Sequence, residues 1–288
     1  FEDAAWVETF SIGYFGIWGN GGYIDASDTA IILGAGPVGL SAAMVAKTSG
    51  ALAAGHNLYH MVPPKDVKRR GKVVAKGLFE EHPGFYPMNK QGQRRPTWSM
   101  GVCGTNKELP HIIARALVAD VKQHVERHGQ LPDFAKPMSV AQGDGFTGCQ
   151  CDDCRKLVHE QQSEAAPLVL MLNRTLEEVN NTYPDLKIIT FAYFETLDAP
   201  KTLKPHEHLW FNVVSSARSQ NAAGDQMGPI RNNPANRDYA RAIEDWPKIA
   251  PNRVTIWHWD SYRAEWPSMF YVAENVRYMR DCGIYGVN

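Results

Sequence analysis

Apolar residues recur at helical spacing in four stretches of the chain after residue 98. Each stretch repeats an apolar side chain every three or four positions, which places these side chains on one face of an α-helix. Thr105 or Asn106 can cap the first stretch, Gly129 can end it, and Pro184 follows the second. The pattern predicts helices at residues 106–129, 165–182, 239–246 and 269–279.

Short runs rich in β-branched and aromatic residues lie between these stripes, at residues 138–142, 187–194, 208–214, 254–259 and 284–287. Strands that alternate with helices predict β–α units around a parallel sheet. Earlier extended runs near Ile31, Leu58 and Met100 bring the total to about eight strands, the number that closes a TIM barrel. We therefore expect an α/β fold of the TIM (β/α)8-like type, whose completeness at the two termini the sequence leaves open.

Charged side chains follow several of these predicted strands. Asp144, Glu195 and Asp260 each come after an apolar run, and Arg218 follows the run that ends at residue 214. The loops after the strands form the active-site rim of a TIM barrel, so these groups are candidates for one site. Hydrolysis of a glycosidic bond needs two such carboxyl groups, one protonated and one ionised. A helix cap also favours aspartate, which is the structural alternative for each carboxylate taken singly.

The composition narrows the choice of partners. The chain has 288 residues, 44% of them hydrophobic, which is enough for a full-sized core. Its 30 basic and 31 acidic residues give a formal net charge of -1, so we expect no nucleic-acid partner. Segment 30–46 is the one candidate for a membrane span, but its glycines and proline favour a strand followed by a helix, and we expect no span.

Aromatic residues point to a different ligand. Eight tryptophans and eleven tyrosines are present, and rings at strand ends commonly stack on sugar rings. The alternative is that most of these rings fill the core. Together with the strand-end carboxylates they favour a carbohydrate ligand.

The first residues contain neither an initiator methionine nor a secretory signal, so we expect a fragment or a processed product. Five cysteines cannot all pair within one chain, so disulfides do not indicate the compartment. The compartment and the oligomeric state are left open.

Cys149, Cys151 and Cys154 lie within six residues of one another along the chain. Disulfides between such close neighbours are strained, whereas their thiolates can converge on one tetrahedral ion. Cys103 follows another apolar run and is the best candidate for a fourth ligand. The pattern favours a structural zinc site. Free buried thiols, or one disulfide with spare cysteines, are the alternatives.

A glycine-rich turn between Gly34 and Gly39 resembles the nucleotide-binding turn of medium-chain, zinc-type alcohol dehydrogenases. A working dinucleotide site also needs an acidic residue at the end of the next strand, roughly 20 residues further on. None precedes Pro63, so we expect no bound NAD(P). We divide the chain into residues 1–54, which are an ordinary strand, turn and helix or a foreign insert, and a barrel domain at 55–288.

Several blocks of residues 55–288 resemble the domain of unknown function 4838 family, namely 55–59, 79–86, 102–106 and 143–155. That family is similar to bacterial carbohydrate-active TIM barrels, distantly of the α-glucuronidase type, and its activity is not settled. The resemblance implies that Asp144 and Asp260 line the site and that His56 and Tyr59 lie on the same rim. One departure is the Gly143-Asp144 pair, where family members usually carry Asn-Asp.

The leading hypothesis is a glycoside hydrolase-like protein in which Asp144 is the acid and Asp260 or Glu195 the ionised partner. The side chains expected to position a sugar are His56, Tyr59, Trp257, Trp259 and Arg218. The guanidinium of Arg218 would suit an acidic sugar, because its shape matches a carboxylate. The alternatives are a non-catalytic carbohydrate-binding barrel and, least favoured, a nicotinamide-dependent oxidoreductase.

Overall fold

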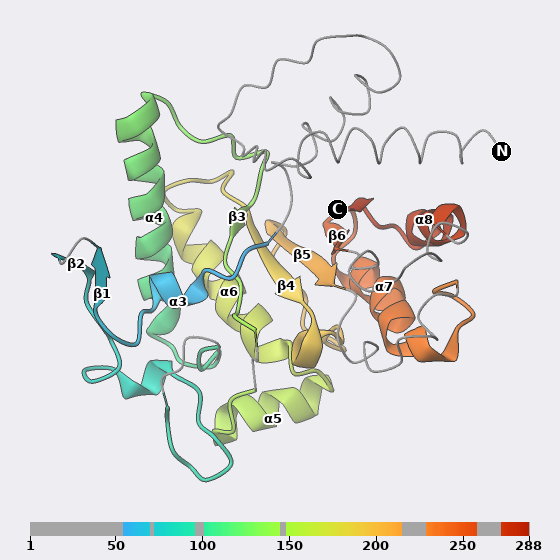
Figure 1. Ribbon diagram of the computed structural model, residues 1–288, viewed down its shortest axis with the longest axis horizontal. Coiled ribbons are helices and arrows are strands. Elements are labelled where there is room, and N and C mark those ends of the chain that lie inside the picture. The colour runs from blue at the N-terminus through green and yellow to red at the C-terminus, as the bar shows by residue number, and fades with distance from the viewer. Residues whose placement is uncertain are drawn as a thin grey trace.

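A computed structural model describes residues 54–69, 72–95, 101–144, 148–214, 229–257 and 272–287. Within these residues a five-stranded parallel sheet forms the centre of the fold, in the order β3-β4-β5-β6-β7 (Figure 1). The strands are β3 (Met138–Ser139), β4 (Ile188–Ala192), β5 (Leu209–Val214), β6 (Val254–Trp257) and β7 (Gly286–Val287). Each strand pairs with the next one along the chain. The predicted α/β class and parallel sheet are confirmed.

The two central strands are buried at every position. β4 reads IITFA and β5 reads LWFNVV, with no alternation of apolar and polar residues. Such runs are typical of parallel strands that are covered on both faces. Figure 1 shows α4 (Leu109–His128) and α6 (Ala166–Val179) near β3 and β4, and α7 (Arg237–Ile249) and α8 (Val272–Asp281) near β5 and β6. Buried side chains of these helices and of the sheet form one hydrophobic core.

The four predicted helices are α4, α6, α7 and α8, with ends displaced by a few residues. The N-cap of α4 is Glu108, two residues after the predicted cap Asn106. The Asn106 side-chain oxygen still accepts the backbone N–H groups of Glu108 at 2.9 Å and Leu109 at 3.0 Å at this end of the helix. Gly129 ends α4 with a φ of 71°. Within the described part of the chain, no helix is both long and apolar enough to cross a membrane.

Segment 55–58 lies beside β3 and extends the sheet by a partial strand. The Asn57 side chain donates to the Ser139 carbonyl at 2.6 Å and accepts the Ala141 amide at 3.1 Å. The Leu58 amide then bonds to the Ala141 carbonyl at 3.1 Å. A parallel bridge at the same point confirms the direction of the segment.

The extended run predicted near Leu58 forms only one parallel bridge, between His56 and Ala141, before the chain turns into α3 (Leu58–Met61). The Asn57 side chain, rather than the backbone of a regular strand, bonds to the Ser139 carbonyl and the Ala141 amide there. The sequence pattern also missed other elements: β1 (Val67–Arg69), β2 (Lys72–Ala75), η2 (Pro83–Phe85), α5 (Asp152–Gln161), η3 (Phe194–Thr196) and η5 (Pro234–Asn236). The runs near Ile31 and Met100 and the Gly34–Gly39 turn lie outside the described residues.

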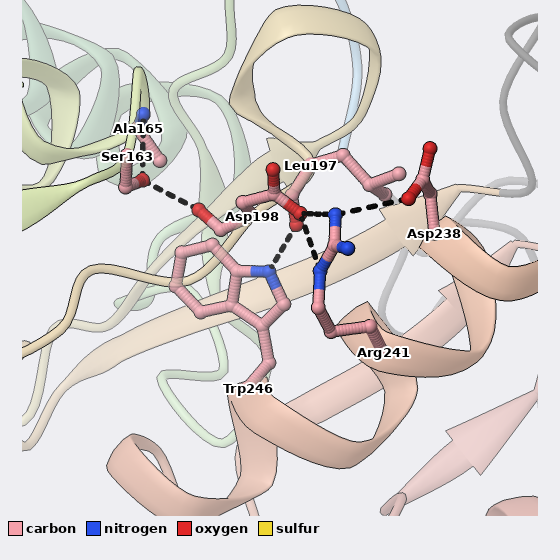
Figure 2. A network of polar contacts seen from close by, with 7 residues as sticks. All are labelled: Ser163, Ala165, Leu197, Asp198, Asp238, Arg241 and Trp246. Atoms are coloured by element: carbon pink, nitrogen blue, oxygen red, sulfur yellow. Dashed lines mark hydrogen bonds and ion pairs between the residues drawn. The ribbon is translucent and has the colours of Figure 1, made fainter.

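A polar network fastens α7 to the segment that follows β4 (Figure 2). The Trp246 indole, which is fully buried, donates to the Leu197 carbonyl at 2.7 Å. The Arg241 guanidinium pairs with the Asp198 carboxylate at 2.8 Å. The Ser163 hydroxyl donates to the Asp198 carbonyl at 2.5 Å. The loop after η3 is therefore held from both sides.

Candidate functional site

Three side chains from separate segments meet at the carboxyl edge of the sheet. Asp144 follows β3, Tyr193 follows β4, and His56 lies on the segment beside β3. The Tyr193 hydroxyl donates a hydrogen bond to Asp144 Oδ1, and His56 Nε2 lies 3.2 Å from the same oxygen. Parallel strands end at a common edge, which explains why Asp144 can meet both Tyr193, 49 residues later in the chain, and His56 from the segment before β3. We call these three residues the acid–base cluster.

The cluster combines a buried phenol, that of Tyr193, with an exposed carboxylate, that of Asp144. Tyr193 is 7% exposed, whereas the Asp144 side chain is 75% exposed. Burial and the hydrogen bond to the Asp144 carboxylate raise the pKa of Tyr193 above the usual value. The phenol is therefore a stable proton donor to a carboxylate that faces solvent.

The orientation of the His56 ring follows from its partners. His56 Nδ1 lies 2.6 Å from the Gln142 carbonyl, which can only accept, so Nδ1 carries a proton. Its other nitrogen, Nε2, lies 3.2 Å from Asp144 Oδ1, so the ring connects the Gln142 carbonyl to the Asp144 carboxylate. Within the described residues both contacts to Asp144 fall on Oδ1. Among the same described residues, no hydrogen bond or ion pair involves the other oxygen, Oδ2.

Gln142 joins the end of β3 to η3 beneath the cluster. Its side chain is fully buried and donates to Thr196 Oγ1 at 2.7 Å and to the Phe191 carbonyl at 3.4 Å. Its backbone carbonyl receives His56 Nδ1. A single residue thus fixes the spacing between the His56 ring and the turn that carries Tyr193.

Aromatic rings adjoin the cluster. The Phe191 ring lies 4.9 Å from the His56 ring and 5.8 Å from the Trp257 ring, measured between centroids. Trp257 was named from the sequence, whereas Phe191 and Tyr193 were missed. Both occur near the carboxyl end of the apolar run 187–194, which was predicted only as a strand. Their position at the end of β4 was the signal that could have identified them.

The other residues predicted to line the site are not members of the acid–base cluster or lie outside the described residues. Glu195 lies on η3, two residues after Tyr193, with an exposed side chain. Tyr59 lies on α3, with its ring centroid 4.0 Å from that of His60. Arg218, Trp259 and Asp260 lie outside the described residues.

Four cysteine side chains form a second cluster, which we call the thiolate centre. Their sulfur atoms all lie within 4.8 Å of one another. The distance from Cys103 Sγ is 3.6 Å to Cys151 Sγ and 3.8 Å to Cys154 Sγ. The predicted convergence of Cys103 with the three later cysteines is confirmed, and the members are Cys103, Cys149, Cys151 and Cys154.

Local backbone structure brings the later cysteines together. Cys151 is the N-cap of α5 and Cys154 lies in its first turn, so both sulfur atoms point to one end of that helix. Cys149 precedes the helix and accepts the Met88 amide on its sulfur at 3.3 Å. The Thr105 hydroxyl lies 3.1 Å from Cys154 Sγ. The centre is therefore enclosed by protein groups that can donate hydrogen bonds to sulfur.

Negative charge concentrates in this centre. Hydrogen bonds with Cys149 and Cys154 lower the pKa of Cys103 far below its usual range, although burial opposes the shift. The contact with Cys103 raises the pKa of Cys149 to about 11. The same neighbours raise the pKa of Cys154 strongly. Without a cation, the lowered pKa of Cys103 and the raised pKa values of its neighbours favour one thiolate among protonated thiols. A bound cation would favour deprotonation of all four cysteines.

A family model described as Domain of unknown function (DUF4838) matches residues 56–288. No curated protein and no solved structure matches the chain.

Proposed function

The chain belongs to the family described as Domain of unknown function (DUF4838), and from that premise we propose a carbohydrate-active protein of the glycoside hydrolase type, with chemistry centred on Asp144. One observation carries the proposal. An exposed carboxylate stands at the carboxyl edge of a parallel sheet, with a buried phenol and an imidazole on one of its oxygens. Aromatic rings beside it offer a surface on which a sugar can stack.

We further propose that the sheet is part of a TIM (β/α)8-like barrel. Five parallel strands follow one another in chain order, and segment 55–58 adds a parallel neighbour to β3. A doubly wound sheet would reverse its strand order at some point, whereas a barrel never does. Barrel active sites lie at the carboxyl edge, where the acid–base cluster lies.

The contacts of Asp144 favour the ionised role in a pair of carboxyl groups. The Tyr193 hydroxyl donates a hydrogen bond to Oδ1 and stabilises negative charge there, and His56 Nε2 lies 3.2 Å from the same oxygen, so Oδ2 can act as the base or nucleophile. We propose this role in place of the proton-donor role expected from the sequence. Glu195 or Asp260 would then protonate the leaving oxygen. Arg218 would recognise an acidic sugar.

The test compares substrates that need a proton donor with substrates that do not. We would measure turnover of aryl glycosides and uronides with poor and activated leaving groups by wild type, Asp144→Asn, Glu195→Gln and Asp260→Asn. An activated leaving group departs without protonation, so a variant lacking the acid keeps activity on it. We expect Asp144→Asn to lose about 100-fold or more on both classes, because the ionised group is needed in each.

Asp133→Asn is the matched control, since Asp133 is exposed and precedes β3 at the opposite edge of the sheet. Equal turnover by wild type and Asp144→Asn would refute the assignment of Asp144. Saturable binding of a glycan without turnover would favour a non-catalytic carbohydrate-binding barrel. Binding of NAD(H) or NADP(H) in calorimetry would favour the oxidoreductase instead.

We also propose that the thiolate centre binds one structural zinc ion. A zinc–sulfur bond of about 2.3 Å in tetrahedral geometry places the sulfur atoms about 3.8 Å apart. Two of the sulfur–sulfur separations, 3.6 and 3.8 Å, fit this geometry, and all of them are within 4.8 Å. Four thiolate ligands leave no open position, which is typical of structural rather than catalytic zinc.

Metal analysis of protein purified under reducing conditions tests the zinc proposal. We expect one zinc per chain in wild type and its loss in Cys154→Ser. Cys282→Ser is the matched control, because Cys282 lies at the end of α8 and takes no part in the thiolate centre. Folded wild type without metal, or a Cys282→Ser variant that also loses zinc, would contradict the proposal.

A further inference from the structure

The thiolate centre is covered by the segment from residue 84 to residue 94, which we call the covering loop. The Cys103 amide donates to the Phe85 carbonyl at 2.8 Å. Met88 uses both of its backbone groups, since its amide bonds to Cys149 Sγ at 3.3 Å and its carbonyl accepts the Gln150 amide at 2.8 Å. The loop therefore contacts both cysteine segments of the centre.

Arg94 ends the covering loop, and its guanidinium bonds back to the backbone of that loop. An isolated antiparallel bridge pairs it with Met88. Its Nη1 donates to the Tyr86 carbonyl at 2.5 Å and to the Gly84 carbonyl at 3.3 Å. These carbonyls flank that of Phe85, which accepts the Cys103 amide at 2.8 Å, so the cation lies beside the segment that carries Cys103. Burial lowers the pKa of Arg94, but its interaction with the cysteines raises the pKa overall.

The charge of the centre requires a counterion. Four thiolates around a divalent cation carry a net charge of −2, and a buried net charge is costly unless an opposite charge lies close to it. The positive charge of Arg94 acts on Cys103, Cys149 and Cys151. Arginine suits this position better than lysine, because its planar fork can bond to two backbone carbonyls while its delocalised charge stays beside the cysteine segment.

We propose that Arg94 is a positioning residue of the metal centre, whose guanidinium partly neutralises the tetrathiolate–metal unit and fastens the covering loop to it. This inference rests on the zinc proposal above. Groups that donate hydrogen bonds to metal ligands commonly change metal affinity by 10- to 100-fold when removed, roughly the size of effect expected here.

The experiment uses the full chain as wild type, Arg94→Gln, Arg94→Lys and Arg95→Gln. Zinc affinity is measured by competition with a chromophoric chelator. We expect Arg94→Gln to bind zinc roughly 10- to 100-fold more weakly, with Arg94→Lys between it and wild type. Arg95→Gln is the matched control, because Arg95 is exposed and its guanidinium contacts Gln93 Oε1 at 2.7 Å. It should bind zinc like wild type.

A second readout separates charge from simple support of the loop. Replacing zinc with Co²⁺ gives a sulfur-to-metal charge-transfer band. A positive charge beside the sulfur stabilises the electron while it is still on sulfur and so raises the transition energy. Removing that charge moves the band to longer wavelength. We expect this shift in Arg94→Gln and a smaller shift in Arg94→Lys, which keeps the charge. Loosening of the loop alone predicts no such ordering between the two variants.

Equal zinc affinity and an unmoved cobalt band in Arg94→Gln would overturn the role of Arg94 while leaving the zinc proposal intact. Wild type that binds neither metal would refute the zinc proposal, and this inference with it. If Arg94→Gln does not fold, Arg94→Lys decides the question. A lysine variant that binds zinc somewhat more weakly than wild type, with a small shift of the cobalt band, would support the role of the charge, and a loss of zinc as large as that of Cys154→Ser would refute it.

Discussion

At the scale of single residues, the hydrogen-bond environment of the Asp144 carboxylate is formed by groups that are distant in the sequence. The sequence identified it as a strand-end acid and identified His56 only through a family resemblance. Tyr193 was missed, because a tyrosine at the end of an apolar run is indistinguishable from a core residue until the neighbouring strand is placed. A side chain that acts through its hydrogen-bond partner becomes visible only when that partner is known.

A double-mutant cycle tests this contact without any substrate. We expect Tyr193→Phe and Asp144→Ala to be coupled by about 1 kcal/mol in urea unfolding, since a hydrogen bond to a charged group is worth more than this and solvent exposure of Asp144 weakens it. Tyr193→Phe combined with Asp133→Ala is the control and should be additive. Additivity in the Asp144 cycle as well would show that the contact contributes nothing to stability.

At the scale of elements, the thiolate centre depends on how the loop before α4 packs on α6. A Cβ atom on Gly104 would lie 2.3 Å from the Pro167 carbonyl oxygen at the start of α6. Gly104 directly follows Cys103, so this close approach also places a sulfur ligand. The cysteine spacing predicted the cluster, but the helix packing that closes it has no sequence pattern of its own.

Gly104→Ala should therefore lower the free energy of unfolding by at least about 2 kcal/mol, because two backbones must move apart. The measurement is urea unfolding under reducing conditions. Gly286→Ala is the control, since a Cβ there meets nothing within 4 Å, and it should change stability by less than about 0.5 kcal/mol. A Gly104→Ala protein as stable as wild type would disprove the tight contact.

At the scale of the whole molecule, burial of tyrosines couples the fold to alkaline pH. Burial raises the pKa of Tyr86, Tyr193 and Tyr278 above the ordinary value of about 10. Their phenols donate hydrogen bonds in the folded state, for example from Tyr86 to the Pro63 carbonyl at 2.9 Å. The unfolded state would release these protons first.

The sign of the pH dependence follows from these raised values. The stabilisation is fully present below about pH 10 and is lost as the pH rises toward the folded-state pKa values, because the unfolded chain then binds fewer protons. In an absorbance titration at alkaline pH we expect these three of the eleven tyrosines to ionise late, together with unfolding seen by circular dichroism. Tyr193→Phe should remove one late-ionising group. Complete ionisation near pH 10 with an unchanged fold would contradict the expectation.

The sequence by itself determined the features that depend on local patterns. Helical spacing gave α4, α6, α7 and α8, apolar runs gave the sheet strands, and the spacing of three cysteines together with Cys103 gave the thiolate centre. These succeeded because periodicity and short spacing act through neighbours along the chain.

Tertiary structure alone decided which distant groups meet. It turned the chain at Leu58 into a helix, brought the Tyr193 hydroxyl to Asp144, and bound Arg94 to the backbone of the covering loop. In each case the outcome depends on a hydrogen bond between segments that are far apart or that share no periodic signal. Such contacts form only once the strands have paired, so no local pattern in the sequence encodes them.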